Sequence, residues 1–394
     1  MALSNKFIVV LVLLKLCFCG TTYSTSANKN LVAVVQIFRH GQRTPVQFYT
    51  NDPYSNITFW DGLEPGQLTN VGKRQQYQLG QFSRHRYKDW LSLIYDKNVF
   101  YAQTTDVDRT HMSAQANIYG LYPAEGDEVW KPRLDWQPIP IHPADANVIS
   151  SFPDCPNFIK EWANVLSSTY FLSLDKLYAP IYKYLTEKSG DNITSLSEAS
   201  DIYDCLKIES DVGLKIPDWS NIVFPQYLKN ISGYSFKSLS YTTKLQRLGG
   251  GPLLNEILKH FESFQVKATN PKYKIYSAHD SNIAMILNSL GAFDPPYPPD
   301  FASSIYFELR KKNGKFYVNV FSKNNNDFKP VSIRGCDLDC PLSEVRARLS
   351  DILIDVKLRN AECTENLYFS DKIAEERYNK LITSGELNKT IIRF

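Results

Sequence analysis

Short apolar runs and apolar residues at helical spacing alternate along this chain of 394 residues. A run that contains β-branched or aromatic residues and is bounded by polar residues predicts a buried strand. The last two such runs flank the turn Lys312-Asn313-Gly314, which predicts a hairpin. The runs that predict strands are residues 31–38, 99–102, 273–277, 304–309 and 316–321.

Helices are predicted between these strands, where apolar residues recur every three or four positions. Thr105 or Asp106 can cap one of these helices, which places Arg109 in its first turn. Strands that alternate with helices predict an α/β fold built on a sheet. The predicted helices cover residues 69–87, about 106–119, 157–187, 197–208, 244–264 and 281–290.

The first 24 residues have the pattern of a secretory signal peptide. An apolar stretch at residues 7–18 follows Lys6 and precedes small residues, and it is too short for a membrane span. Later stretches fall short of about 18 apolar residues, so we expect a secreted, extracellular protein with no membrane anchor. Four N-x-[ST] sequons agree with the secretory pathway, at Asn56, Asn192, Asn230 and Asn388.

The middle of the chain differs in pattern from its two ends. Residues 123–156 are rich in proline and tryptophan and lack periodicity, and mostly helical segments follow them. Without the signal peptide about 370 residues remain, which is more than one hydrophobic core usually serves. We therefore expect a catalytic core in two parts, residues 28–124 and 244–394, with a mostly helical cap at residues 125–243.

The charge balance narrows the class of partner. The formal net charge is only +3 and the charged residues are evenly spread. Nucleic acid and anionic membrane attract proteins with concentrated positive charge. We therefore expect small-molecule partners and no nucleic acid.

Five cysteines remain once Cys17 and Cys19 are removed with the signal peptide. An odd number in an oxidising compartment leaves one thiol over. Cys336 and Cys340 are spaced to close a local disulfide loop or, alternatively, to contribute to a metal site. Since no histidine lies near them in the sequence, the metal site is the weaker alternative.

Residues 39–45, with the sequence RHGQRTP, follow directly on the first predicted strand. They place His40 between the guanidinium groups of Arg39 and Arg43. Arginine neutralises and orients phosphate oxygens through a planar fork of donors, and neutral imidazole can carry a covalent phosphoryl group. Gly41 would let the backbone approach a ligand. The motif predicts a phosphoryl-transfer site, and the alternative is a basic surface turn.

Two other polar motifs also lie next to predicted strands. The segment TTDVDRT contains Arg109, and the segment SAHD contains His279 and Asp280. Ligands of open α/β sheets bind at the carboxyl ends of the strands. We therefore expect the loops that carry His40 and His279 to converge on one pocket.

These three segments, together with GGGPLL at residues 249–254, resemble in order and spacing the signature of the histidine acid phosphatases. The likeness extends to the secreted animal branch of that family, which includes prostatic, lysosomal and insect venom enzymes. It covers nearly the whole mature chain. It implies a phosphoglycerate-mutase-like core, that is, a mixed sheet with helices on both faces, and a smaller, mostly helical cap.

The same resemblance implies an activity and a role for each candidate residue. The activity is hydrolysis of phosphate monoesters through a covalent phosphohistidine, without a metal or a cofactor. His40 would be the nucleophile, and Asp280 would protonate the leaving alcohol. The groups that would bind the phosphate oxygens are Arg39, Arg43, Arg109 and His279.

The resemblance also implies a disulfide pattern. It joins Cys336 to Cys340 and Cys155 to Cys363. Cys205 is then left either unpaired or as a bridge between two chains, which would make the protein a homodimer.

Several alternatives stay open from the residues. A phytase-type enzyme of the same family would need a strongly basic bowl, which the near-neutral charge does not favour, and a lysophospholipid phosphatase is a further variant. A cytosolic mutase also begins with R-H-G, but the signal peptide and the sequons argue against it. A secreted, non-catalytic binding protein would be marked by a lost nucleophile or arginine, and neither is lost here.

Overall fold

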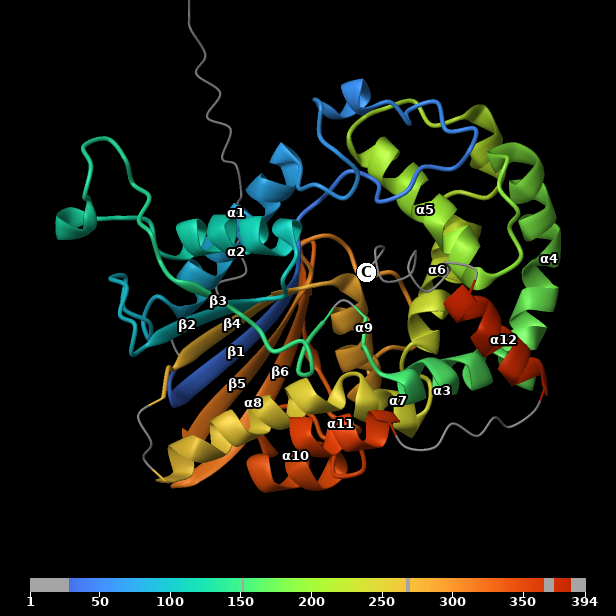
Figure 1. The fold of residues 1–394 in the computed structure, drawn as a ribbon. Coiled ribbons are helices and arrows are strands. Elements are labelled where there is room, and N and C mark those ends of the chain that lie inside the picture. The colour runs from blue at the N-terminus through green and yellow to red at the C-terminus, as the bar shows by residue number, and fades with distance from the viewer. Residues whose placement is uncertain (1–27, 151, 267–269, 365–371, 384–394) are drawn as a thin grey trace, which may run out of the picture.

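The structure is a computed structural model that describes residues 28–150, 152–266, 270–364 and 372–383 (Figure 1). The predicted signal peptide and Asn388 lie outside these residues. An eight-stranded mixed sheet forms the centre, in the order β3-β2-β4-β1-β5-β6-β7, with β8 paired to β6. The strands are β1 Leu31–Arg39, β2 Phe100–Thr104, β3 Ile141–Pro143, β4 Tyr273–Ala278, β5 Ser304–Lys312, β6 Lys315–Asn324, β7 Asp327–Val331 and β8 Cys340–Pro341.

The side-chain alternation of β1 explains why helices cover both faces of the sheet. Val34 and Phe38 point to one face, where they pack with residues of α1 and α2. Val35 and Ile37 point to the other, where they join the core formed with α8 and α9. A strand buried on both faces reads as a continuous apolar run, as this one does. The predicted fold class is therefore confirmed.

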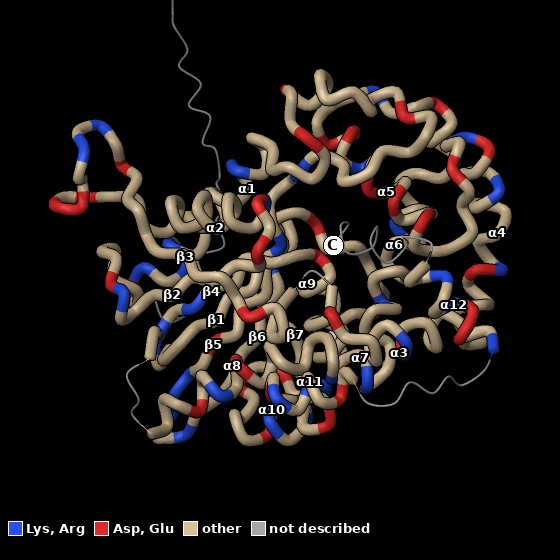
Figure 2. The backbone as a smooth tube through the Cα atoms, viewed as in Figure 1, with Lys and Arg blue, Asp and Glu red and all other residues tan. Residues whose placement is uncertain are grey.

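The helices surround the sheet and continue into a separate group beside it. In Figure 1, α4, α5 and α6 lie to the right of the sheet, and α1 and α2 lie above it. Lysine, arginine and acidic residues are interspersed over both regions (Figure 2). The helices are α1 Asn70–Tyr87, α2 Asp108–Leu121, α3 Pro156–Leu166, α4 Thr169–Ser189, α5 Leu196–Asp211, α6 Gln226–Ser238, α7 Thr243–Leu248, α8 Gly251–Ser263, α9 Asp280–Ser289, α10 Leu342–Arg348, α11 Val356–Thr364 and α12 Lys372–Thr383.

Two of the predicted helices are each divided in two. The helix expected at residues 157–187 is split into α3 and α4, because the Ser168 hydroxyl accepts a hydrogen bond from Phe171 N and starts a new helix. The helix expected at 244–264 is split at Gly249 and Gly250, and Pro252 lies in the first turn of α8. Local capping groups therefore decided both breaks.

The predicted side-chain cap of α2 is wrong. The helix begins at Asp108 behind Val107, whose side chain makes no capping bond. Thr105 lies too far before the helix start, and its hydroxyl contacts Thr110 and His279 instead. Arg109 still lies in the first turn of α2, as expected.

Candidate active site

The catalytic segment and the His-Asp segment follow two neighbouring parallel strands. In the register of β1 and β4, Arg39 lies opposite Ala278, so His40 and His279 both follow directly on the strand ends. The backbone N–H of His40 donates to Ala278 O at 2.9 Å. The two imidazole rings lie 5.6 Å apart, centroid to centroid. The convergence predicted from the strand ends is present in the structure.

The environment of His40 fixes the proton on one of its ring nitrogens. Its Nδ1 lies 2.8 Å from Gly41 O, and since a carbonyl only accepts, Nδ1 carries the proton and Nε2 keeps its lone pair. Burial lowers the pKa of His40 well below its ordinary value, and the charges of Arg109 and Arg39 lower it further. The imidazole is therefore neutral and nucleophilic.

Gly41 allows a close approach of backbones, although not to a ligand as the sequence suggested. A Cβ at this position would lie 2.2 Å from Gly72 O in the first turn of α1. The N–H of Gly41 donates to Ser113 Oγ at 3.0 Å, which ties the loop to α2 as well. The glycine thus lets the loop that carries His40 lie directly on two helices, and this fixes the ring's position.

His279 is buried at the start of α9 and is held through one nitrogen. Its Nε2 lies 2.8 Å from Thr105 Oγ1, and Nδ1 has no hydrogen-bond partner among the described residues. Burial lowers the pKa of His279 well below its ordinary value, and the charges of Arg109 and Arg39 lower it further. From the sequence we expected Thr105 as a possible helix cap, and its contact with His279, 174 positions away, had no local signal.

Arg39 and Asp280 form a buried ion pair at the centre of the site. The Arg39 Nη2 atom lies 2.6 Å from Asp280 Oδ2, and Arg39 Nη1 donates to Pro299 O at 2.6 Å. The guanidinium also lies 3.9 Å above the ring of Phe301, which is far from Arg39 in the sequence. This is a cation–π contact. These contacts fix the plane of a group that can donate to phosphate.

Arg43 is anchored by a carboxylate from outside the sheet region. Its Nη1 atom lies 2.9 Å from Asp204 Oδ2, on α5, and also donates to Thr44 O at 3.3 Å. Burial disfavours the charge of Arg43, but attraction to Asp204 outweighs this and raises its pKa above the ordinary value. Asp204 was not among the predicted site residues, because its distance of 161 positions from Arg43 leaves no local signal.

Arg109 supplies the third buried guanidinium. Burial, and after it the charge of Arg43, lowers the pKa of Arg109 to about 9. Its Nε has no hydrogen-bond partner among the described residues. A cation held near other cations in a buried place favours an anion beside it. The site thus combines three guanidinium groups with the carboxylates of Asp204 and Asp280, which pair with Arg43 and Arg39.

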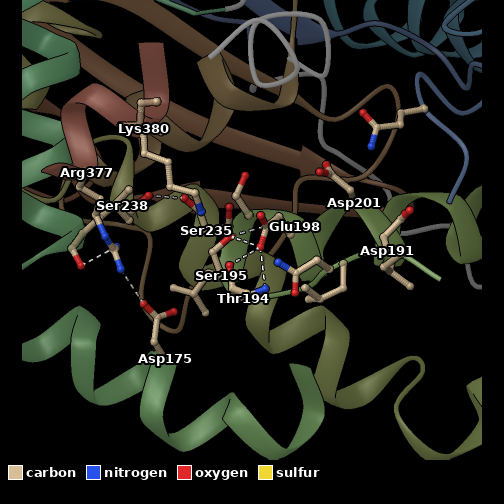
Figure 3. A pocket seen from close by; sticks show the side chains of 18 of the residues that line it. Asp175, Asp191, Thr194, Ser195, Glu198, Asp201, Ser235, Ser238, Arg377 and Lys380 are labelled. Carbon is tan, nitrogen blue, oxygen red and sulfur yellow. Dashed lines mark hydrogen bonds and ion pairs between the residues drawn. The ribbon is translucent and has the colours of Figure 1, made fainter. Parts of the chain in front are cut away.

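Two hollows lie on opposite faces of α5. A small crevice beside Arg39, Arg43 and Asp280 is lined on the α5 side by residues that include Tyr203 and Asp204. A cavity of about 410 Å³ lies on the other face and is lined by acidic residues that include Glu198 and Asp201 (Figure 3). The residues that line this larger cavity include none of the six predicted catalytic and phosphate-binding residues. Three of those six residues, Arg39, Arg43 and Asp280, line the small crevice.

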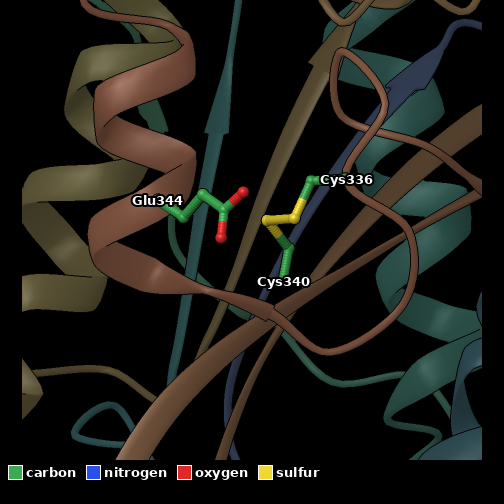
Figure 4. A group of neighbouring side chains, drawn as sticks. All are labelled: Cys336, Cys340 and Glu344. Atoms are coloured by element: carbon green, nitrogen blue, oxygen red, sulfur yellow. A yellow bond between two sulfur atoms is a disulfide. The ribbon is translucent and has the colours of Figure 1, made fainter.

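Both disulfides implied by the resemblance are present, Cys155 with Cys363 and Cys336 with Cys340. Glu344 lies next to the second pair, yet the two sulfurs are bonded to each other and do not form a thiolate site (Figure 4). Cys205 is a buried free thiol that donates to Gln47 O at 2.8 Å. Burial in the core favours the unpaired alternative for Cys205 over a bridge between chains.

The described sequon residues lie at the surface. Asn56, Asn192 and Asn230 are exposed. Within the described residues, we find no helix that has both the length and the apolar character needed to cross a membrane.

Comparison with known proteins gives the family. The profile of the histidine phosphatase superfamily (branch 2) matches residues 30–323. A lysosomal acid phosphatase of Xenopus laevis is 34% identical over 83% of this chain and 77% of its own length. A prostatic acid phosphatase of Bos taurus is 32% identical over 86% of this chain and 91% of its own length. A venom acid phosphatase of Apis mellifera is 35% identical over 80% of this chain and 84% of its own length.

Solved structures agree on the fold. Hafnia alvei phytase, at 19% identity, superimposes with a TM-score of 0.62 over 82% of this chain and 97% of that one. The phytase of Klebsiella sp. ASR1, at 18% identity, also superimposes with a TM-score of 0.62, over 82% of this chain and 96% of that one. From the sequence match and the shared fold together, the chain belongs to branch 2 of the histidine phosphatase superfamily and is a phosphomonoester hydrolase.

Proposed function

We propose that this protein is a secreted acid phosphatase that transfers the phosphoryl group of a monoester first to Nε2 of His40 and then to water. One observation carries the proposal. A neutral imidazole, whose proton is fixed on Nδ1 by Gly41 O, lies beside buried guanidinium groups and a carboxyl group that belong to three different strand ends.

The first step needs the phosphate dianion to be neutralised before a nucleophile approaches. Arg39, Arg43 and Arg109 supply this charge, and His279 adds a donor to a non-bridging oxygen. The dianion competes with Asp280 for Arg39, which frees the carboxylate from its ion pair, and the freed carboxylate takes up a proton from water. His40 then attacks phosphorus opposite the leaving oxygen.

Asp280 completes both halves of the reaction. As the bond from phosphorus to the leaving oxygen breaks, the carboxyl group gives that oxygen a proton, so an alcohol departs. Water then attacks the phosphohistidine, the carboxylate takes a proton from the water, and His40 and inorganic phosphate are released. Because the guanidinium groups supply the positive charge, the proposed reaction is independent of metal and cofactor.

The cap and the secretory route belong to the same proposal. We place the cap at residues 125–243, between the two parts of the core, where α5 borders the crevice. Two disulfides and three exposed sequon residues support folding in the secretory pathway and export from the cell. A homodimer and the absence of nucleic acid as a partner stay predictions.

Turnover of nitrophenyl phosphate by the purified mature protein, at acidic pH and with or without a chelator, tests the activity. We expect equal turnover in both conditions. Rapid quenching with labelled substrate should trap a phosphoryl group that is labile in acid and stable in base, as a phosphohistidine is. Loss of turnover with the chelator, or the absence of such a label, would contradict the proposed mechanism.

A phytase-type activity is the weaker alternative. The phytases that match in structure are under 20% identical, so they support the fold alone. A substrate with several phosphates needs a concentration of cations around the site, whereas charges of both signs are interspersed over this chain.

A further inference from the structure

The crevice beside Asp280 is the place for the leaving group, if the proposed function is right. Asp280 protonates the leaving oxygen, and the crevice opens on the side of Asp280, Arg39 and Arg43. Its remaining walls come from α5, α6 and the segment before β5. They are formed by Ser200, Tyr203, Asp204, Lys207, Ser232, Phe236, Pro298, Pro299, Asp300 and Phe301.

Two carboxylates in these walls stand outside the predicted catalytic set. Asp204 is one-fifth exposed and lies 2.9 Å from Arg43, and Asp300 is half-buried and accepts from Asn325 Nδ2 at 2.8 Å. Burial lowers the pKa of Arg39, and the negative charges that oppose this effect are those of Asp280, Asp204 and Asp300. Both wall carboxylates are thus close enough to act electrically on a phosphate-binding residue.

The lysine in the crevice wall, Lys207, has its charge balanced by a neighbouring carboxylate. Lys207, on α5, forms an ion pair with Asp211 one turn further along the same helix. Tyr203, Phe236 and Phe301 add aromatic surface between the charged groups. Apart from the catalytic residues, the crevice therefore presents two carboxylates, aromatic rings and a lysine whose charge is balanced.

A negatively charged leaving group would meet these carboxylates when its phosphate is bound. Like charges at a few ångströms in a partly buried site repel strongly. A neutral leaving group avoids this cost, and a cationic one gains from the same field. Discrimination by repulsion is a common way to obtain specificity.

We propose that Asp204 and Asp300 are specificity-determining residues, which restrict the enzyme to phosphate monoesters of neutral or cationic alcohols and disfavour leaving groups that carry carboxylate or phosphate. Asp204 has a second, positioning role, because it also holds Arg43. Asp300 touches none of the three phosphate-binding arginines through a described hydrogen bond or ion pair, so its substitution isolates the effect of charge.

The test compares esters that differ mainly in the charge of the leaving group. Glycerol 3-phosphate releases a neutral alcohol, 3-phosphoglycerate releases a carboxylate, and phosphoethanolamine releases a cation. We expect kcat/KM of the wild-type enzyme to be about tenfold or more higher for glycerol 3-phosphate than for 3-phosphoglycerate. Phosphoethanolamine should match or exceed glycerol 3-phosphate, and high salt should shrink the differences.

Charge-neutralising variants then assign the discrimination to residues. Asp204→Asn keeps an oxygen that can accept from Arg43, and Asp300→Asn removes no described hydrogen bond or ion pair of the three arginines. Each should lower the ratio of kcat/KM between glycerol 3-phosphate and 3-phosphoglycerate by about threefold or more. Asp201→Asn is the matched control, since Asp201 lies on the same helix but lines the larger cavity, and it should leave the ratio unchanged.

The possible outcomes separate this inference from the function on which it rests. If nitrophenyl phosphate is not hydrolysed at all, the proposed function fails. If it is hydrolysed but the wild-type enzyme has the same kcat/KM for glycerol 3-phosphate and 3-phosphoglycerate, only the inference fails. The inference is also overturned if Asp204→Asn and Asp300→Asn both leave this ratio of kcat/KM unchanged. The same holds if the control Asp201→Asn lowers the ratio as much as they do.

Discussion

The two hollows on either side of α5 differ in almost every property that matters for chemistry. The larger, of about 410 Å³, is bordered by Glu198, Asp201 and Arg377 and is remote from the strand ends. The smaller adjoins the carboxyl ends of β1 and β4, where Arg39, Arg43 and Asp280 meet. Size is therefore a poor guide to the site in this protein.

The smaller hollow differs from the larger one in its buried cations, Arg39 and Arg43. Side chains around the larger cavity largely satisfy one another, as Arg377 does with Asp175 and Glu198 with Ser195. Among the predicted phosphate-binding residues, the Nε atoms of Arg39 and Arg109 lack a described hydrogen-bond partner. Unmet donors that converge on one place favour an anionic ligand there.

The largest effect should come from the nucleophile. His40→Ala removes the atom that carries the phosphoryl group, so kcat should fall by about 10^4-fold or more while the thermal midpoint changes little. The matched control is Glu198→Gln in the larger cavity, which should change kcat by less than about threefold. Comparable losses in both variants would mean that the two hollows have been assigned wrongly.

Loss of a phosphate-binding cation should have the next largest effect. Arg109→Ala deletes a preorganised positive group, and we expect kcat/KM for nitrophenyl phosphate to fall by about 10^2-fold. Arg377→Ala removes an arginine from the larger cavity and serves as the control, with kcat/KM nearly unchanged. A loss of only a few-fold at Arg109 would show that its guanidinium does not contact the transferring group.

A leaving-group effect should distinguish Asp280 from the arginines. Asp280→Asn cannot donate a proton, so alkyl phosphates should lose about tenfold more kcat than nitrophenyl phosphate, whose leaving group departs without one. Equal losses on the two classes of ester would exclude Asp280 as the general acid.

The smallest effect concerns stability and comes from a buried carboxyl group at the end of α5. Burial, together with the negative charge of Asp52, raises the pKa of Glu209 to about 9. The unfolded chain releases this proton above about pH 4.3, so folding loses stability as the pH rises from there towards 9. Glu209→Gln keeps a neutral group and should therefore raise the thermal midpoint at about pH 8 by about 3 °C or more.

Calorimetry at two pH values checks this sign. At about pH 3, where Glu209 is protonated in both states, the variant and the wild type should melt at about the same temperature. If Glu209→Gln raised the thermal midpoint equally at both pH values, the gain would come from better contacts of the glutamine and not from removal of an ionisable group. Activity at acidic pH serves as a control for an intact site.

Much of the fold and of the site could be predicted because the signals are local. The run at residues 31–38 is buried on both faces of the sheet, and the period of helices such as α1 is visible in the sequence. His40 and His279 follow strand ends, so the rule that ligands bind at that edge brought them together correctly. The family resemblance added the roles and the two disulfides, which spacing alone leaves open.

Other features depended either on competition between local signals or on contacts between distant segments. The breaks at Ser168 and Gly249 are decided by capping groups that compete with a continuous apolar pattern. The contact of Gly41 with Gly72 exists only because α1 folds back onto the catalytic loop. Asp204 and Phe301 reach the arginines from 161 and 262 positions beyond Arg43 and Arg39 respectively.

The sequence by itself determined the strands, the phosphate chemistry and the edge of the sheet where that chemistry occurs. Residue type and period carry this information, and both are properties of neighbouring positions. Only the tertiary structure decided which carboxylate anchors Arg43, which hollow beside α5 adjoins Arg39 and Asp280, and that Cys205 is buried. These depend on distances across the chain, and charge acts through space whatever the separation in sequence.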